Sequence, residues 1–237
     1  MNTTETTGPV VAIVVAAGSG VRLGGEVPKA LRSVRGVPLV TRSVRQLAAG
    51  GCDVALVVVA PGLGDEFADA LSGAPIPCHL VVGGAERQDS VRNGLIAIAD
   101  DPELADAPVI LVHDAARALV PAEVVARVIE AVRGGASAVI PVVDVVDTIR
   151  QVHAGGSSVV DRSHLRAVQT PQGFEAGALA AAHELVAEHG LVLTDDAAAC
   201  EFAGLVVTLV DGDPDALKVT TPLDLVLAEA IAAAREA

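Results

Sequence analysis

Short valine-rich runs recur along the chain, and several of them are apolar at nearly every position. A strand with one face in water alternates apolar and polar residues, so a continuous apolar run fits a strand covered on both faces. Such strands form parallel sheets, and here helical segments separate the runs. The pattern predicts an α/β fold with strands at Val10–Ala16, Asp53–Ala60, Cys78–Val82, Pro108–His113, Ser137–Val143 and Leu205–Val210.

The helical segments have boundary signals of their own. Two glycines follow Val37–Ala49, which predicts a helix over that range. Near the end of the chain, Thr221 is a typical N-cap, Pro222 suits the first helical position and Asp224 places an acid in the first turn. Strands and helices together predict a Rossmann-like, mostly parallel sheet flanked by helices.

One segment breaks the alternation of strands and helices. Residues 144–170 alternate polar and β-branched side chains around Ala154–Ser158, which predicts a β-hairpin arm that projects from the sheet. The chain has 237 residues and no internal repeat of roughly 20–50 residues. We therefore expect a single domain over residues 10–237, with the arm inserted in it and a flexible tail at residues 1–9.

Composition argues against several classes of function. The chain has three phenylalanines and no tryptophan or tyrosine, so a site that stacks bases on aromatic rings is nearly excluded. Sixteen basic residues against thirty acidic ones give a net charge of −14, which repels nucleic acid and anionic membranes. We expect no nucleic-acid partner.

The cysteines and the first residues indicate a compartment. Cys52, Cys78 and Cys200 are odd in number and widely spaced, which supports neither a disulfide framework nor a zinc cage. The first nine residues lack a basic region, and no apolar run approaches the roughly 18 residues of a membrane span. We expect a cytoplasmic protein without membrane association.

A glycine-rich loop, Ala16–Gly25, follows the first expected strand. Glycines allow backbone N–H groups to approach an anion closely, although such a loop is often only a turn. The dinucleotide fingerprint needs glycine where this chain has Leu23, and the P-loop needs lysine where it has Glu26. Instead Arg22 within the loop and Lys29 just after it place two cations beside the backbone N–H groups, as a polyphosphate would require.

Lysine use points to two positions. Fourteen of the sixteen basic residues are arginine, and the lysines are Lys29 and Lys218. A compact ammonium can approach a phosphoryl oxygen where a planar guanidinium does not fit, although two surface lysines left by chance would look the same. Lys218 lies between the last strand and the last helix, where ligands bind such sheets.

Asp114 ends a buried run and should lie at the carboxyl end of a central strand. An acid there could hold Mg²⁺ or a substrate hydroxyl, or it could be an N-cap paired with Arg117. His113 fits a core histidine better than a catalytic base. A second glycine turn, Gly83–Ser90, opens a helix, and Thr194-Asp195-Asp196 looks like an N-cap followed by acids.

Seven ordered motifs, AAGSGVRLG, PKA, GGAERQDSV, VHDAAR, TPQGF, TDD and LKVTTPLD, resemble the 2-C-methyl-D-erythritol 4-phosphate cytidylyltransferases. The match covers about Val11 to Ala233, and VHDAAR with TPQ is its most specific part. The resemblance implies a nucleotidyltransferase of the non-mevalonate isoprenoid pathway. It would transfer CMP from CTP to methylerythritol phosphate, release pyrophosphate and use Mg²⁺ or another divalent cation.

The resemblance also implies roles for the matching residues on the nucleotide side. The catalytic cations would be Arg22, Lys29 and Lys218, which stabilise the charge that builds up at the phosphates. The nucleotide would be bound by Ala16, Ala17, Gly18, Gly20, Gly84, Ala85, Ser90, Asp114 and Ala115, and the metal by Asp114.

On the acceptor side, the resemblance implies a substrate set of Asp114, Arg117, Thr148, Arg162, Thr170, Thr194 and Lys218. Members of the family are homodimers, and their projecting arm would bring Thr148 and Arg162 into the neighbour's site. The chain departs from the family pattern at Ala30, where many members have glutamine, and at Ala197-Ala198, where the usual serine is missing.

Three other functions stay open at this point. A cytidylyltransferase for another polyol phosphate, such as ribitol 5-phosphate, would share the nucleotide motifs. A dinucleotide-dependent oxidoreductase is disfavoured by Leu23 and by the lack of an acid after the second strand. A non-catalytic nucleotide sensor would bind CTP and release no pyrophosphate.

Overall fold

The computed structural model describes residues 8–18, 23 and 27–236. Its strands are β1 (Val10–Val15), β2 (Ser33–Val34), β3 (Val37–Pro38), β4 (Val54–Val59), β5 (Cys78–Val82), β6 (Val109–Asp114), β7 (Ala138–Asp144), β8 (Arg150–His153), β9 (Gly156–Val159), β10 (Arg166–Val168), β11 (Gln172–Glu175) and β12 (Val207–Asp211). Its α-helices are α1 (Leu39–Ala49), α2 (Gly64–Leu71), α3 (Arg87–Ala99), α4 (Ala122–Arg133), α5 (Ala176–Glu188), α6 (Asp196–Phe202) and α7 (Pro222–Arg235), and its short 3-10 helices are η2 (Lys29–Leu31) and η3 (Arg162–His164).

The central sheet is mostly parallel, as the apolar runs predict. Its centre is β1, which pairs in parallel with β4 on one side and β6 on the other, and β5 extends the sheet beyond β4. Antiparallel β11 joins β6 to β7. Strand β10 pairs with the end of β7, and β12 pairs with β7 in parallel. The α/β fold with a mostly parallel sheet is confirmed.

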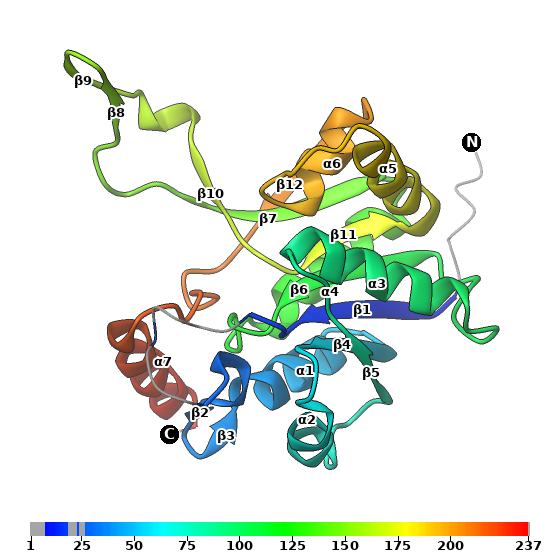
Figure 1. Ribbon diagram of the computed structural model, residues 1–237. Coiled ribbons are helices and arrows are strands. Elements are labelled where there is room, and N and C mark those ends of the chain that lie inside the picture. The colour runs from blue at the N-terminus through cyan, green and yellow to red at the C-terminus, as the bar shows by residue number, and fades with distance from the viewer. Residues whose placement is uncertain (1–7, 19–22, 24–26, 237) are drawn as a thin grey trace.

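Helices cover both faces of this sheet, which explains why its central strands β1, β4 and β6 are apolar at nearly every position. Ala12 and Val14 of β1 pack into the core with α1, α2 and α4, whereas Ile13 packs on the opposite face with α3, α5 and α6. Helix α7 packs separately, through Ala228 and Ala232, against the segment that includes Leu119. Figure 1 shows the helices above and below the sheet. No helix among the described residues is long and apolar enough to span a bilayer.

Helix boundaries follow the local signals with one difference. The N-cap of α7 is Thr221, and Asp224 accepts a hydrogen bond from its backbone amide at 2.7 Å, so the closing helix begins where the sequence predicts. Helix α1 begins at Leu39 rather than Val37. The reason is that Val37 and Pro38 pair with Ser33–Val34 in a short antiparallel ladder.

The predicted projecting arm is present. Strands β8 and β9 pair in an antiparallel hairpin around Ala154-Gly155, and every residue of the two strands is exposed. The hairpin extends away from the rest of the molecule, and β10 returns from it to the sheet (Figure 1). Residues 1–7 of the expected tail lie outside the described residues, and the Gly8 carbonyl accepts a hydrogen bond from the Arg133 guanidinium at 3.1 Å.

Candidate functional site

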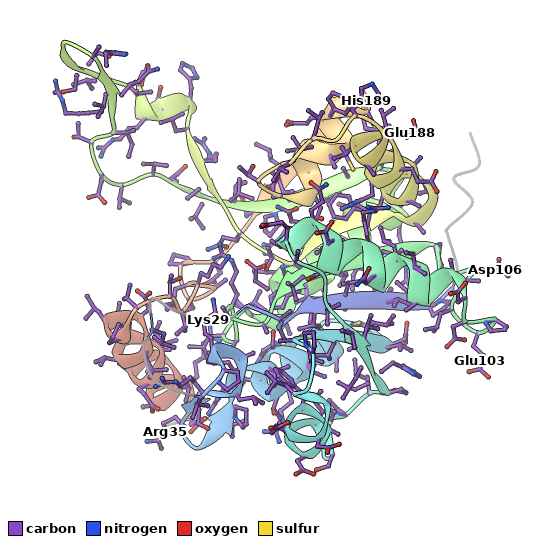
Figure 2. The ribbon with its side chains drawn as sticks, viewed as in Figure 1. Lys29, Arg35, Glu103, Asp106, Glu188 and His189 are labelled. Atoms are coloured by element: carbon purple, nitrogen blue, oxygen red, sulfur yellow. The ribbon has the colours of Figure 1, made fainter. Side chains whose placement is uncertain are left out.

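Most of the expected site residues that the structure describes gather at the carboxyl ends of the parallel strands. Val15 ends β1 and Asp114 ends β6, and the two residues are partners in the parallel register. Because parallel strands end together, the loops that follow them meet at this edge. Figure 2 shows Lys29 at this edge and Glu103 with Asp106 at the opposite end of the sheet.

A cleft of about 200 Å³ opens at this edge. It brings together the ten expected nucleotide-side residues that the structure describes: Ala16, Ala17, Gly18, Lys29, Gly84, Ala85, Ser90, Asp114, Ala115 and Lys218. The expected Gly20 and Arg22 lie outside the described residues. Ala30, which stands where many family members have glutamine, also lines the cleft.

Two glycine turns pack tightly against each other beside the cleft. A Cβ added at Gly83 would lie 2.8 Å from the Ala17 Cβ, and one added at Gly84 would lie 2.2 Å from the Asp89 Cβ. Neither position can accept a side chain without a shift of its neighbours. Ser90 Oγ accepts a hydrogen bond from the Gly84 amide at 3.2 Å. The serine therefore shapes the second turn.

Asp114 lies between two cations. Its Oδ2 is 2.6 Å from Lys218 Nζ, and its Oδ1 is 3.4 Å from Arg87 Nε. Burial alone would raise the pKa of Asp114, which is 8% exposed, but Arg87 and Lys218 hold that pKa well below its usual range. The carboxylate is therefore ionised at neutral pH.

Arg87 is the site residue that sequence reasoning missed. It is the first residue of α3 and lines the cleft, and its Nη1 lies 2.7 Å from Asp196 Oδ2. Asp196 in turn is buried, with its Oδ1 3.0 Å from His183 Nε2. The available signal was Arg87 itself, a cation three residues after Gly84, at the point where the second glycine turn opens α3.

A second cavity of about 160 Å³ adjoins the cleft, with Arg87, Asp114 and Lys218 lining both. The second cavity is also lined by three expected acceptor-side residues, Arg117, Thr170 and Thr194.

Two local interpretations of this region are wrong. Arg117 makes no ion pair with Asp114 among the described contacts, because its guanidinium donates to the carbonyls of Ala216 and Val168. Thr194 is not the cap of the following helix. Asp195 is, since its carboxylate accepts from the Ala198 amide at 3.0 Å.

His113 is a core histidine, as expected. Its Nδ1 lies 3.0 Å from Thr170 Oγ1, and the same hydroxyl oxygen accepts a hydrogen bond from the Asp114 amide at 3.0 Å. Burial lowers the pKa of His113 to about 4. The imidazole is therefore neutral at pH 7 and fixes Thr170 next to Asp114.

Thr148 and Arg162 are not brought into the site of their own chain. Both lie on the arm and are exposed, and neither lines the cleft or the second cavity. The Arg162 guanidinium donates to the Val146 carbonyl, which is also part of the arm.

A glycine-rich turn, a strand-end carboxylate and nearby cations at the carboxyl edge of a mostly parallel sheet define a nucleotide-binding α/β protein. Comparison with known proteins identifies the reaction. A family model described as 2-C-methyl-D-erythritol 4-phosphate cytidylyltransferase matches residues 10–234. Proteins of that name from Corynebacterium diphtheriae and Nocardia farcinica are 50% and 46% identical to the chain. These alignments cover 94% and 98% of the chain and 93% and 97% of the relatives.

Solved structures agree. The crystal structure of 2-C-methyl-D-erythritol 4-phosphate cytidylyltransferase from Thermus thermophilus is 35% identical, with a TM-score of 0.76, covering 94% of this chain and 98% of that one. The chain belongs to the 2-C-methyl-D-erythritol 4-phosphate cytidylyltransferase family. It is a nucleotidyltransferase that transfers a cytidylyl group from CTP to methylerythritol phosphate in the non-mevalonate pathway. The family and function predicted from the motifs are confirmed.

Proposed function

We propose that the cleft binds CTP and that the second cavity binds the phosphate and hydroxyls of 2-C-methyl-D-erythritol 4-phosphate. The observation that supports this assignment is that the two cavities meet at Asp114, Arg87 and Lys218. A donor in one cavity and an acceptor in the other would have their phosphates side by side at these charges. Ala16–Gly18 and the Gly84–Ser90 turn would hold the triphosphate and the nucleoside, respectively.

The reaction then needs charge neutralisation more than covalent chemistry. An oxygen of the acceptor phosphate forms a bond to the α-phosphorus of CTP, the bond from that phosphorus to the β-phosphate bridging oxygen breaks, and pyrophosphate leaves. Negative charge accumulates on the oxygens of the α-phosphorus, where Lys29 and Arg22 would act, while Lys218 would hold the attacking phosphate. Burial raises the pKa of the Cys52 and Cys200 thiols to about 12, so neither is a nucleophile at neutral pH.

The local charges also resolve a conflict with the net charge of −14, which repels anionic substrates at a distance. Lys29, Arg87 and Lys218 line the cleft, and their attraction for phosphate at short range would have to outweigh that repulsion.

The carboxylate of Asp114 suits a divalent cation that the phosphate oxygens of the substrate also bind. Within the part of the chain that the structure describes, no three His, Cys, Asp or Glu side chains are grouped to form a protein cage. Mg²⁺ is often bound by one carboxylate together with phosphate oxygens and water, and Asp114 is an ionised carboxylate at the cleft. Asp114 would hold Mg²⁺ there, and the ion would neutralise charge on the phosphates.

The arm supports a proposal for the assembly. Val146, Val152 and Val159 on the arm are largely exposed, which favours a protein contact at this segment. We propose that residues 144–170 join two copies of the chain and bring Thr148 and Arg162 to the partner's acceptor cavity. Their distance from the cavities of their own chain then has a functional reason.

The three cysteines are free thiols, which fits a cytoplasmic enzyme in a reducing environment.

Pyrophosphate release tests the substrate assignment. The enzyme is mixed with CTP, Mg²⁺ and either methylerythritol phosphate or ribitol 5-phosphate. We expect release with the first acceptor and at least about tenfold less with the second, because a cavity that pairs polar groups rejects a mismatched polyol. Equal rates with both acceptors would contradict the assignment of the second cavity. CTP binding without release with either acceptor would indicate a nucleotide sensor.

A further inference from the structure

Arg87 is shared by two ion pairs at the junction of the two cavities. Its Nη1 contacts Asp196 Oδ2 at 2.7 Å, and its Nε contacts Asp114 Oδ1 at 3.4 Å. The other oxygen of Asp114 contacts Lys218 Nζ at 2.6 Å. Each oxygen of Asp114 therefore faces one cation. Of these two cations, Lys218 has the compact ammonium at the end of a flexible side chain, whereas Arg87 has a planar guanidinium.

An ammonium has three N–H donors, so Lys218 can share its charge between Asp114 and the acceptor phosphate, but a closer approach to the phosphate lengthens its 2.6 Å contact with Asp114. That shift would leave a nearly buried carboxylate with less compensation from its closest cation, and an unpaired buried charge is strongly unfavourable. A second positive charge that stays on Asp114 removes the obstacle: Mg²⁺ would supply one when it is bound, and Arg87 supplies one that belongs to the chain. Arg87 already contacts the carboxylate oxygen that Lys218 does not use.

We propose that Arg87 is a positioning residue that keeps the charge of Asp114 compensated while Lys218 exchanges Asp114 for the acceptor phosphate. The proposal rests on the role given above to Lys218. In this role Arg87 affects the binding of the acceptor phosphate indirectly, through Asp114 and Lys218.

The buried pair of Asp196 and His183 fixes Arg87 for this role. Asp196 is 1% exposed, and its two oxygens contact Arg87 and His183 separately. Neither Asp196 nor His183 lines the cleft or the second cavity. A planar guanidinium can bond two carboxylates through different nitrogens, whereas an ammonium is a single point of charge.

A double-mutant cycle tests the proposal in the full-length enzyme. Pyrophosphate release is measured for Arg87→Gln, Lys218→Gln and the double variant, with CTP and methylerythritol phosphate each varied. We expect Arg87→Gln to lower kcat/KM for the acceptor by about 10–100-fold. KM for CTP should rise by a smaller factor than KM for the acceptor, because Lys29 and the Ala16–Gly18 turn, which would hold the triphosphate, are unaltered.

The informative comparison is with the Lys218→Gln background. There, Arg87→Gln should lower kcat/KM for the acceptor by a clearly smaller factor than in the wild-type background, because no lysine remains to be released. The double variant should also unfold at lower urea concentration, because Asp114 then has neither of its cations. Arg87→Lys should be faster than Arg87→Gln, since it keeps a charge near Asp114. If Arg87→Gln does not fold, Asp196→Asn replaces it, with a loss expected in the wild-type background and none beside Lys218→Gln.

Arg42→Gln is the matched control. The Arg42 side chain is 14% exposed, its Nη2 lies 3.1 Å from Glu236 Oε1, and it lines neither cavity. Its kinetics should stay within about twofold of wild type. The proposal would be overturned if the double variant lost kcat/KM for the acceptor by the product of the two single losses. It would also be overturned if Arg87→Gln had the same kinetics as Arg42→Gln. A Lys218→Gln enzyme with normal rates would instead contradict the proposed function of the second cavity.

Discussion

The side-chain amide of Gln169 is hydrogen-bonded in both directions to the backbone of Asp213. Gln169 Nε2 donates to the Asp213 carbonyl at 2.8 Å, and Oε1 accepts from the Asp213 amide at 3.0 Å. Gln169 is 4% exposed and follows β10, where the chain returns from the arm. Asp213 belongs to the loop that leads to Lys218, so this pairing ties the lysine loop to the base of the arm.

Replacing Gln169 with leucine should therefore affect both stability and turnover. The variant leaves the Asp213 amide without its acceptor and leaves the Asp213 carbonyl with only the bond from the Ala216 amide, which costs about 1–3 kcal/mol of unfolding free energy. KM for the acceptor should rise because the Lys218 loop loses its restraint. Urea unfolding and pyrophosphate-release kinetics measure the two effects. Gln46→Leu, at a half-buried position of α1 that lines neither cavity, is the control; equal behaviour of the two variants would contradict the restraint.

Lys29→Ala should lower kcat far more than it weakens CTP binding. A charge that acts mainly in the transition state contributes about 10²–10³-fold to kcat, by analogy with an oxyanion donor. Steady-state kinetics with varied CTP separate kcat from KM. Arg45→Ala removes one exposed cation from α1 and serves as the matched control, with unchanged kinetics expected. Equal losses in kcat and CTP affinity would assign Lys29 to ground-state binding.

Buried His113 should make the protein less stable in mild acid. Its pKa in the folded protein is about 4, below the ordinary value of 6.5, so the unfolded chain binds more protons between these values. The stability that the neutral imidazole contributes is present above pH 6.5 and decreases as the pH falls toward 4. At pH 5 the loss is about 2 kcal/mol relative to pH 7.

Urea unfolding at pH 5 and pH 7 measures this loss. His113→Gln should remove most of the difference between the two pH values. His164→Gln should retain it, because the His164 side chain is 85% exposed. An unchanged pH dependence in His113→Gln would show that another group is responsible.

The proposed exchange of arms predicts complementation between two inactive variants. Lys29→Ala damages a chain's own site, whereas Arg162→Ala would damage the partner's site. In a mixed dimer, one site would then combine an intact Lys29 with an intact Arg162. When equal amounts of the two variants are mixed and their subunits exchange freely, half of the dimers contain one chain of each kind. Each mixed dimer has one complete site of two, so the mixture should recover about a quarter of wild-type activity.

Sedimentation provides the matching structural test of the arm. A chain without residues 152–160 should sediment as a monomer and lose activity. A shortened chain that stays dimeric and fully active would contradict the arm's role, as would a mixture of the two point variants that stays inactive.

The sheet and its edge were predictable because their signals are local. Continuous apolar runs such as Val54–Val59 indicate strands that are covered on both faces, and Asp114 follows the same kind of run. The capping residues at Thr221 and Asp224 act within one turn of helix, so α7 could be placed closely.

Contacts between distant parts of the chain were not predictable in this way. Arg87 and Asp196 are 109 positions apart, and neither residue has a neighbour that reveals the other. Asp195 and Asp196 are adjacent acids with similar sequence context, but one caps α6 and the other is buried against Arg87 and His183. Only the contacts of Asp196 with Arg87 of α3 and His183 of α5 separate their roles.

A crystal structure of the enzyme with CTP, Mg²⁺ and an unreactive analogue of the acceptor phosphate is the most direct test of how the site works. It measures the distances from Lys29 Nζ and Lys218 Nζ to the phosphate oxygens. We predict both nitrogens within about 3 Å of a phosphate oxygen, with Lys218 released from Asp114 and Arg87 still on it. The account would be contradicted if the ammonium groups of Lys29 and Lys218 both lay far from every phosphate oxygen and Lys218 remained paired with Asp114.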